Sequence, residues 1–482
     1  MNYLMILYIL GSVLKFEAVF LLLPAVVGFI YGESSGLYFL GAAILSLVCG
    51  MILGHKKPEE MMLYTREGFV SVALSWIIMS VFGALPMCLC GDIPFYVDAL
   101  FETISGFTTT GASICTNVEI LTHATQFWRS FTHWIGGMGV FVFIMAILPM
   151  MGGSTMNLMK AESPGPSVSK LVPHVKDTAK ILYGMYIILT VAEIGTLIMF
   201  GMPLFDSLIT TFGTVGTGGF GIKCDSIAPY SPALQIIVTI FMILSGINYS
   251  AYFLVMTRKF KEVFEIEEVR WYLGVILGSS LIIAVNIHHI YGAWGNSLRH
   301  SFFQVASIIT TTGYATADFD QWPMLSKTIL VLLMFMGACA GSTGGGIKVS
   351  RLIILSRSVK KELSLIIHPR EIKKIRMDGH VIEHEVLRNT NVFLVIYFMI
   401  LFISVLLISV DDFSFTTNFT AVVSAINNIG PGLDMVGPTG SFAEFGAFSK
   451  FVLMFDMLAG RLELFPVMVM LMPATWRGRE SK

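Results

Sequence analysis

Charge is scarce in this 482-residue sequence. Only 13% of its residues are Asp, Glu, Lys or Arg, whereas 55% are hydrophobic, and the mean hydropathy is +0.76. Soluble domains carry about 25% charged residues, so the composition excludes a soluble globular protein and indicates a chain that lies in a membrane. The six cysteines show no CxxC spacing, and Cys88 and Cys90 are too close together for a zinc knuckle. We therefore expect no metal or redox centre built on cysteine.

Enzyme motifs are missing as well. The sequence has no HExxH motif. Gly341 and Gly346 have the spacing of a phosphate-binding loop, but Ile347 stands where that motif needs lysine, and no strand precedes it. We expect that the protein is not an enzyme, that no nucleotide binds to this chain, and that nucleic acid is not a partner.

The sequence does contain a series of apolar stretches, each near the roughly 20 residues that cross a bilayer as a helix. Every second connection between them is basic, and these connections with the C-terminal tail hold 24 of the 31 Lys and Arg residues. By the positive-inside rule, they and both termini are cytoplasmic. No clean cleavage site follows the first stretch, which we interpret as a retained anchor. The ten stretches are 4–30, 37–54, 68–90, 127–151, 181–202, 233–257, 271–291, 324–340, 390–410 and 447–472.

One short motif recurs. Three threonines precede Gly111 and again precede Gly313, and each glycine follows a serine by six positions. A third copy ends at Gly430 and a looser one at Gly219. Three of the copies follow an apolar segment of about ten residues, which is too short to cross a membrane. Because lipid cannot satisfy the backbone at the ends of such a segment, we expect half-helices buried in protein, at 98–108, 299–309 and 416–426.

This order of segments defines the expected fold class. We predict an all-α polytopic membrane protein, with two N-terminal spans followed by four pseudo-symmetric repeats of span, pore loop and span around one pore. The predicted divisions are 1–65 for the N-terminal spans and 66–179, 180–269, 270–387 and 388–482 for pore repeats one to four.

The four loops suit a monovalent cation. A cation that enters a narrow passage must exchange its water for oxygen ligands, which rings of backbone carbonyls supply. Glycine permits the extended or left-handed backbone that points successive carbonyls one way. A single TTTG sequence is more typical of an ordinary turn, but four copies at matched places favour a filter. The predicted filter residues are Thr110, Gly111, Gly218, Gly219, Thr312, Gly313, Ile429 and Gly430.

The outer side of the predicted topology is acidic. Twelve carboxylates lie there against five basic residues, an excess that would concentrate cations near the pore. Ordinary solvation of loop ends explains any single carboxylate, whereas the whole group favours a cation pathway. The acidic residues are Asp92, Asp98, Glu102, Glu119, Asp206, Asp225, Asp318, Asp320, Asp411, Asp412, Asp434 and Glu444.

A glycine-rich stretch interrupts the span that follows the third loop. Irregular backbone at membrane depth is tolerated only beside protein or a cavity, and this place lies beneath the predicted filter, where the stretch would obstruct or open the path. A packing hinge without a gating role is the alternative. Arg461 lies in the last span. A charged side chain inside a span either forms a salt bridge, here with Asp456 or Glu463, or has a functional role. The predicted gate residues are Gly341, Ser342, Thr343, Gly344, Gly345, Gly346 and Arg461.

The motifs TTTGAS, TGGFG, TTTGYA and NNIGPG, with GSTGGGIKVSR and GRLELFP, resemble the TrkH branch of the Trk/Ktr/HKT potassium-uptake superfamily over essentially the whole chain. The resemblance implies a K⁺ uptake protein of the bacterial inner membrane, a homodimer, one filter glycine per repeat, and a gate at 338–346 beside Arg461. It also implies control by a separate TrkA-type nucleotide-binding ring in the cytoplasm. Relatives with serine at the first filter glycine tend toward Na⁺, and this chain has Gly111. It departs from the family where Gly213 replaces the usual serine of the second loop.

Two further questions stay open. The cytoplasmic segment 357–388 carries a net charge of +3 and several apolar residues. Contact with membrane lipid headgroups would account for the charge, whereas a docking regulator would also cover the apolar residues. The alternative function is a K⁺ symporter coupled to H⁺ or Na⁺, with Glu193, Asp456 and Glu463 as candidate carriers, although no obvious relay of intramembrane carboxylates supports it.

Overall fold

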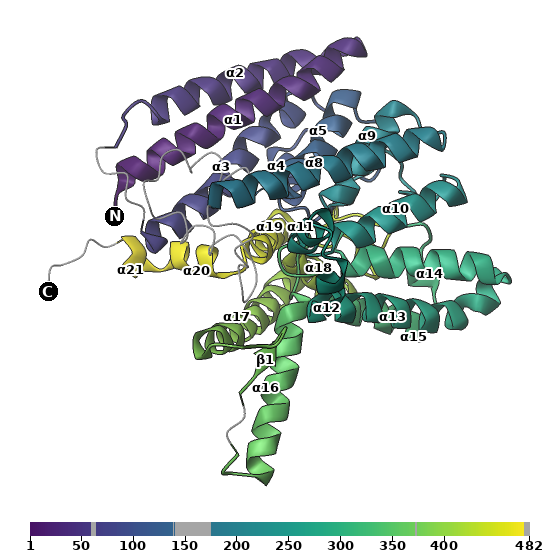
Figure 1. The fold of residues 1–482 in the computed structure, drawn as a ribbon. Helices are drawn as coiled ribbons and strands as arrows, with labels where there is room; N and C mark the ends of the chain where they lie inside the picture. Colours follow the sequence, from purple (N-terminus) through teal and green to yellow (C-terminus); the bar gives the residue numbers. More distant parts are fainter. Residues whose placement is uncertain (59–63, 138, 140–174, 372–373, 477–482) are drawn as a thin grey trace, which may run out of the picture.

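The computed structural model describes residues 1–58, 64–137, 139, 175–371 and 374–476. Helices form nearly all of its regular structure (Figure 1). In these residues the strands are limited to an antiparallel pair, β1 (Arg376–Met377) and β2 (His380–Val381), in which Arg376 faces Val381. The predicted all-α membrane fold is confirmed.

Two long antiparallel helices, α1 (Tyr3–Ile30) and α2 (Ser35–Leu53), form the N-terminal pair. Glycines let their backbones touch, because a Cβ at Gly28 would lie 2.7 Å from the backbone of Gly36. Small residues at such a crossing are a common packing device between membrane helices. The pair packs against the first repeat, and therefore lies outside the predicted pore.

Four units follow, each in the predicted order of long helix, half-helix and second helix. The half-helices are 12 to 16 residues long, somewhat longer than expected from the sequence. Unit 1 contains α3 (Thr65–Leu89), α4 (Tyr96–Phe107) and α5 (His123–Gly137), and unit 2 contains α8 (Val175–Met199), α9 (Leu204–Val215), α10 (Pro232–Ser245) and α11 (Tyr249–Met256). After α12 (Phe260–Glu265), unit 3 contains α13 (Glu267–Tyr291), α14 (Trp294–Ile309), η2 (Phe319–Gln321), α15 (Met324–Phe335) and α16 (Val349–Ile367). Unit 4 contains α17 (His384–Ile408), η3 (Ser409–Asp411), α18 (Phe415–Asn427), η4 (Asp434–Val436), α19 (Ala447–Arg461), α20 (Phe465–Leu471) and α21 (Pro473–Trp476).

Six described helices are long and apolar enough to cross a membrane alone, and the pair α10 and α11 would make a seventh although it bends by 95°. The expected single spans at 233–257, 324–340 and 447–472 are therefore each broken into shorter pieces, and most of the expected span 127–151 lies outside the described residues. The breaks follow Ser245, Phe335 and Arg461, within the second helix of three units. Hydropathy alone hides such breaks, because the residues at them remain largely apolar.

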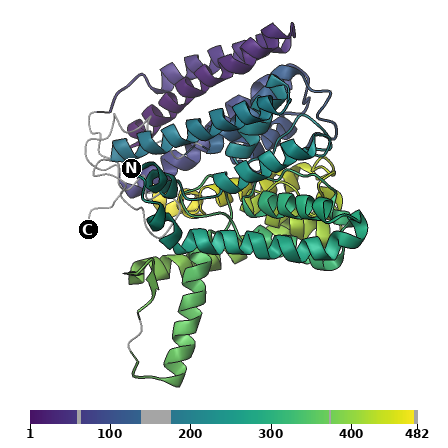
Figure 2. The same ribbon diagram turned by 45° about the vertical axis from the view of Figure 1, so that its right-hand side comes forward.

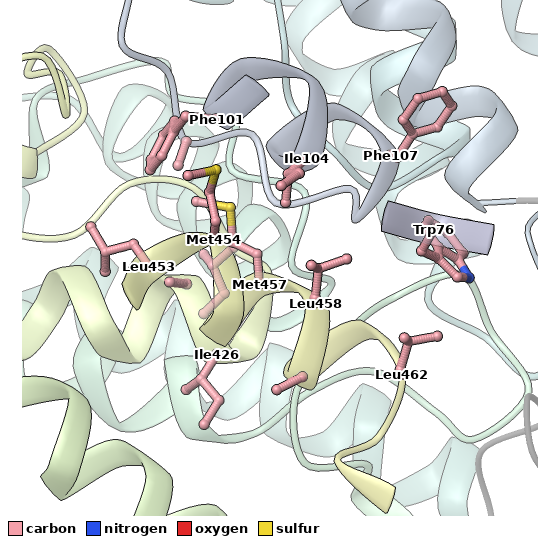
Figure 3. Close-up of a cluster of buried hydrophobic side chains, with 14 of the residues drawn as sticks. Trp76, Phe101, Ile104, Phe107, Ile426, Leu453, Met454, Met457, Leu458 and Leu462 are labelled. Carbon is pink, nitrogen blue, oxygen red and sulfur yellow. The ribbon is translucent and has the colours of Figure 1, made fainter. Parts of the chain in front are cut away.

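Helix α19 forms much of the core beside the half-helices. Figure 3 shows Leu453, Met454 and Met457 of α19 between Phe101 of α4 and Ile426 of α18, and all five side chains are at most 3% exposed. This packing fixes the half-helices of units 1 and 4 against a common helix. Rigid placement of these helices is what sets the positions of the loops that follow them.

One end of the molecule is distinctive. Helix α16 projects from the bundle in both views, and the β1–β2 hairpin lies near the base of this helix (Figures 1 and 2). The first and last described helices meet, since the Tyr3 hydroxyl donates to the carbonyl of Trp476 at 3.2 Å. The two ends of the described chain therefore lie on one side of the molecule.

Candidate ion pathway and gate

Each half-helix ends in a turn closed by the same hydrogen bond. The residue before the predicted filter glycine donates its N–H to the carbonyl five positions earlier, at 2.8 to 3.0 Å in all four units. The backbone alone makes this contact, so it survives the sequence differences between the units. The four pairs are Thr110 with Ser105, Gly218 with Gly213, Thr312 with Ser307, and Ile429 with Ser424.

Left-handed backbone appears twice in every turn, at the filter glycine and at the residue two positions before it. Positive φ is uncommon for residues other than glycine, yet it recurs here at three threonines and an asparagine, which shows that the turns share one conformation. The φ values are 54° and 76° at Thr109 and Gly111, 55° and 81° at Thr217 and Gly219, 57° and 85° at Thr311 and Gly313, and 55° and 101° at Asn428 and Gly430.

The four turns close into a ring. A Cβ on any filter glycine would meet the carbonyl oxygen of the residue before the filter glycine in the next unit. A side chain at these glycines would thus displace the oxygens that face the axis. The contacts run from Gly111 to Gly218, from Gly219 to Thr312, from Gly313 to Ile429, and from Gly430 back to Thr110, and so bring together all eight predicted filter residues.

Side chains support the ring from behind. In unit 3 the Ser307 hydroxyl donates to the carbonyl of Tyr314 at 2.5 Å, and in unit 4 the Ser424 hydroxyl donates to the carbonyl of Gly430 at 2.6 Å. Unit 2 has Gly213 at this position, and a Cβ there would meet the Tyr314 hydroxyl. That hydroxyl lies 3.2 Å from the carbonyl of Phe220, which follows the second filter glycine. Tyr314 of unit 3 therefore supplies, in unit 2, a brace like the one that serine provides in units 3 and 4.

Two contacts between units were not predicted from the sequence. Nδ1 of the buried His133 lies 2.8 Å from the carbonyl of Gly106, and its Nε2 accepts the N–H of Phe220 at 3.1 Å. This ring joins the half-helix of unit 1 to the turn of unit 2. The Asn428 amide donates to the Thr110 hydroxyl at 3.0 Å and so joins unit 4 to unit 1. No spacing signals these contacts, because each joins residues far apart in the chain.

A cavity of about 130 Å³ lies directly beyond the ring, and the four filter glycines form part of its wall. None of the twelve acidic residues of the predicted vestibule lines it. Arg129 does, and it pairs with the buried Glu102 at 2.6 Å and stacks over the Phe220 ring at 4.2 Å. Lys223 also lines the cavity and lies 3.7 Å from Glu119. The immediate wall thus carries two basic side chains, each paired with a carboxylate that does not line it, and any concentration of cations by the acidic residues acts from farther away.

The glycine-rich stretch lies beneath the ring, as its place in the sequence predicts. The N–H of Gly345 donates to the Thr311 hydroxyl at 2.7 Å, and a Cβ at Gly345 would lie 2.6 Å from the carbonyl of Asn427. The N–H of Tyr249 donates to the carbonyl of Gly341 at 3.1 Å. The stretch therefore contacts the helix break of unit 2 and the ends of the half-helices of units 3 and 4.

Arg461 joins the same stretch. Its guanidinium donates to the carbonyl of Thr343 at 2.7 Å and to the carbonyl of Gly136, in unit 1, at 2.6 Å. The proposed salt-bridge partners are engaged elsewhere, since Glu463 accepts from Arg351 and Asp456 accepts from the Ser404 hydroxyl. A salt bridge with Asp456 or Glu463 is one of the two alternatives from the sequence for Arg461, and the hydrogen bonds described here join it to two backbone carbonyls.

Glu268 holds both ends of the stretch, and sequence reasoning missed it. One oxygen of this buried carboxylate accepts the N–H of Ala340 at 2.7 Å and the N–H of Ser350 at 2.9 Å. Buried Lys348 donates to the carbonyl of Gly344 within the stretch. Glu268 follows Glu265 and Glu267 in an acidic run that resembles a solvated connection, so its sequence context gives no sign of burial.

A ring of backbone carbonyls between half-helices, with a glycine-rich stretch beneath it, is the architecture of a membrane protein that passes cations. Residues 38–476 match the TrkH family of cation transport proteins, and the chain belongs to this family. It is 36% identical to the Trk system potassium uptake protein TrkH of Salmonella typhimurium, over 95% of this chain and 96% of the relative. The corresponding protein of Vibrio parahaemolyticus is 32% identical, over 99% and 100% of the two chains.

A solved structure supports the same assignment. The crystal structure of the potassium transporter TrkH from Vibrio parahaemolyticus aligns with a TM-score of 0.88, at 30% sequence identity, over 99% of this chain and 100% of that one. The predicted family and the predicted fold class are therefore confirmed. The roles of the predicted filter and gate residues remain predictions.

Proposed function

We propose that this protein takes up K⁺ through the ring of backbone carbonyls, and that the stretch 338–346 gates the path. The observation that carries the first part is the closed cycle of contacts between the four filter glycines and the carbonyls of the neighbouring units. Four equivalent turns put oxygens around one axis, and such a ring can replace the water of a monovalent cation. The names of the relatives support K⁺ as the transported ion.

Ion replacement in planar bilayers tests the proposal. Purified protein should pass K⁺ and Rb⁺ in preference to Na⁺ and Li⁺ in single-channel recordings. Equal permeability of all four ions would contradict a selective carbonyl ring. A matched variant, Gly195→Ala, changes a glycine on α8 whose Cβ position is open, and it should leave the ion preference unchanged.

The gating part rests on the position of the stretch beneath the ring. Deletion of Gly344–Gly346 should give K⁺ flux that no longer depends on a regulatory partner. A deletion variant that folds, yet keeps regulated flux, would leave the stretch with the packing role that its contacts also permit. Flux before and after addition of the partner to proteoliposomes distinguishes the two outcomes.

The regulator is proposed to be a TrkA-type nucleotide-binding ring that docks on the segment formed by the projecting helix α16 and the β1–β2 hairpin. Lys360 and Val359 are exposed on α16, and the segment connects directly to Ser350, which Glu268 holds. Substitution of Lys360, Lys361 and Lys374 by Glu should abolish co-purification with such a protein at physiological salt. Retained binding would move the docking site to another cytoplasmic surface.

The assembly and its location complete the proposal. We place the protein in the bacterial cytoplasmic membrane as a homodimer, with both termini in the cytoplasm. The meeting of Tyr3 with Trp476 on one side of the molecule supports a common side for the two ends. Cysteine-accessibility labelling of tagged termini in intact cells tests the side, and cross-linking in membranes tests the dimer.

Coupled symport remains the second candidate because Glu193 on α8, one of the candidate carriers, is fully buried. The Thr214 side chain lies beside its carboxylate. If that group carries H⁺ with K⁺, the reversal potential should shift with a proton gradient, and Glu193→Gln should abolish the shift. A reversal potential that follows K⁺ alone would exclude this coupling.

A further inference from the structure

A groove of about 490 Å³ lies apart from the ion pathway, between the start of α13 and helix α16. Arg270, Trp271 and Gly274 of α13 form one wall with Val275 and Glu267, and Arg357 of α16 lies opposite. The pathway described above uses none of these side chains. The composition of the groove is mixed, because cationic groups lie at one end and an apolar helix face continues from the other.

The charged end has an excess of guanidinium groups. Arg357 pairs with Glu267 at 2.6 Å and also donates to the carbonyl of Arg376. Arg270 donates to the carbonyl of Glu265 at 3.4 Å and forms no ion pair with any residue that the structure describes. Another nearby carboxylate, Asp378, accepts the backbone N–H of Glu267 at 2.8 Å. The wall thus carries two guanidinium groups and one carboxylate. The N–H donors that this carboxylate does not use suit a phosphate group.

The apolar end is a trough along α13. Positions 270, 274, 277, 278 and 281 share one face of the helix by their spacing. A Cβ at Gly274 or Gly278 would meet no atom within 4 Å. Leu277 and Leu281 beside these glycines are 53% and 46% exposed, so the trough is open to whatever surrounds the helix.

We propose that this groove binds an anionic phospholipid, with its phosphate between Arg270 and Arg357 and an acyl chain along the trough. Trp271 is 58% exposed at the same level as the arginines, which suits an aromatic residue at the boundary between headgroups and hydrocarbon. A second copy of the chain is the competing occupant, because Gly274 and Gly278 form a GxxxG face. A two-fold arrangement would, however, bring each Arg270 to the level of its equivalent, and like charges repel.

Native mass spectrometry of the full-length protein tests the proposal. Phosphatidylglycerol and phosphatidylcholine with identical acyl chains are titrated against the wild type, and we expect preference for phosphatidylglycerol. The double variant Arg270→Gln and Arg357→Gln should bind phosphatidylglycerol about 30-fold more weakly, at about fivefold for each lost charge. The control double variant Lys261→Gln and Arg388→Gln removes the same charge from exposed positions that do not line the groove.

The control double variant should bind phosphatidylglycerol with an affinity within about twofold of the wild type, since a specific site depends on the position of the charges and not on net charge. Equal weakening in both double variants would show general attraction to a basic surface and would overturn the proposal. Gly274→Leu keeps both arginines and fills the trough, so it should also weaken binding of phosphatidylglycerol. If it instead separates the dimer and leaves lipid binding intact, the face belongs to a second copy and the proposal is wrong.

Discussion

The carbonyl ring and the stretch beneath it are both glycine-rich and irregular, yet they are held in different ways. Each turn of the ring is closed by a backbone hydrogen bond to its own half-helix. The stretch at 338–346 is closed at its base by backbone hydrogen bonds from Gly337 to Ile347 and from Val349 to Ala338. Between these bonds it also depends on side chains of other elements, chiefly Glu268, Thr311 and Arg461, and loss of a few of those contacts can release it. The comparison fits a static ring and a movable stretch.

The largest effect is expected when the ring itself is changed. Gly111→Ser would put a side chain against the carbonyl of Gly218, at a residue whose φ is 76°. Left-handed backbone costs about 1–2 kcal/mol for an ordinary residue, and about 1.4 kcal/mol corresponds to tenfold. We expect the permeability ratio of K⁺ to Na⁺ to fall by about tenfold or more in bilayer recordings.

Gly221→Ser is the matched control for this prediction. Gly221 lies two residues beyond the second filter glycine and also lines the outer cavity, but a Cβ there would meet only the Tyr314 ring, at 3.8 Å. Its permeability ratio should remain near that of the wild type. An unchanged ratio in Gly111→Ser as well would remove Gly111 from the filter.

The next effect concerns the stretch. Glu268→Ala would leave the N–H groups of Ala340 and Ser350 without their buried acceptor. Hydrogen bonds to a charged group contribute about 1.5–3 kcal/mol each, so the closed arrangement should lose about 3 kcal/mol or more. We expect K⁺ flux without the regulator. Glu268→Gln retains an acceptor, so its flux without the regulator should lie between that of Glu268→Ala and that of the wild type. Glu265→Ala changes an exposed carboxylate and should match the wild type.

The opposite result in these variants would contradict the difference between a static ring and a movable stretch. If Glu268→Ala inserts and folds normally but passes K⁺ only with the regulator present, the side-chain contacts do not keep the stretch closed. The stretch would then be as fixed as the ring, and regulation would act elsewhere. Thermal stability measured beside flux separates this result from a general loss of folding.

A smaller effect in the same direction is expected for Arg461→Ala. The variant loses one hydrogen bond to the stretch, at the carbonyl of Thr343, at a cost of about 1.5–3 kcal/mol for a charge-assisted hydrogen bond. Its second lost bond, to the carbonyl of Gly136, lies outside the stretch. Flux without the regulator should rise, and Arg461→Lys should restore part of the control. A variant that fails to reach the membrane would assign Arg461 a structural role.

The sequence predicts the carbonyl ring better than it predicts the side-chain contacts that hold the stretch beneath it. Local repetition in the chain marks the ring, so Gly111, Gly313 and Gly430 and their half-helices could be placed before the structure. Glu268 and His133 could not, because each acts on residues distant in the chain and neither belongs to a recurring motif. Hydropathy likewise found the apolar stretches but not the breaks after Ser245 and Arg461, since these breaks depend on what packs against them. The glycine-rich stretch did mark the break after Phe335.

The smallest effect is expected at the outer end of unit 4, where a turn depends on a side chain. Asp434 accepts hydrogen bonds from the hydroxyls of Ser414 and Thr417 at the start of α18, and these bonds lower the pKa of Asp434 below its ordinary value of 3.8. A carboxylate with a lowered pKa in the folded state stabilises that state above its unfolded pKa, and the contribution is lost as pH falls through the folded value.

Asp434→Asn should therefore lower the melting temperature slightly at pH 7, because the side chain is exposed and solvent screens its interactions. The difference from the wild type should stay constant above about pH 5 and shrink as pH falls below 3.8, where the wild-type carboxylate also becomes neutral. Asp412→Asn, at an exposed carboxylate of the same outer region, serves as the control. A difference that does not change with pH would mean that Asp434 acts through its shape and not its charge, and the outer turn of unit 4 would then be closed like the ring.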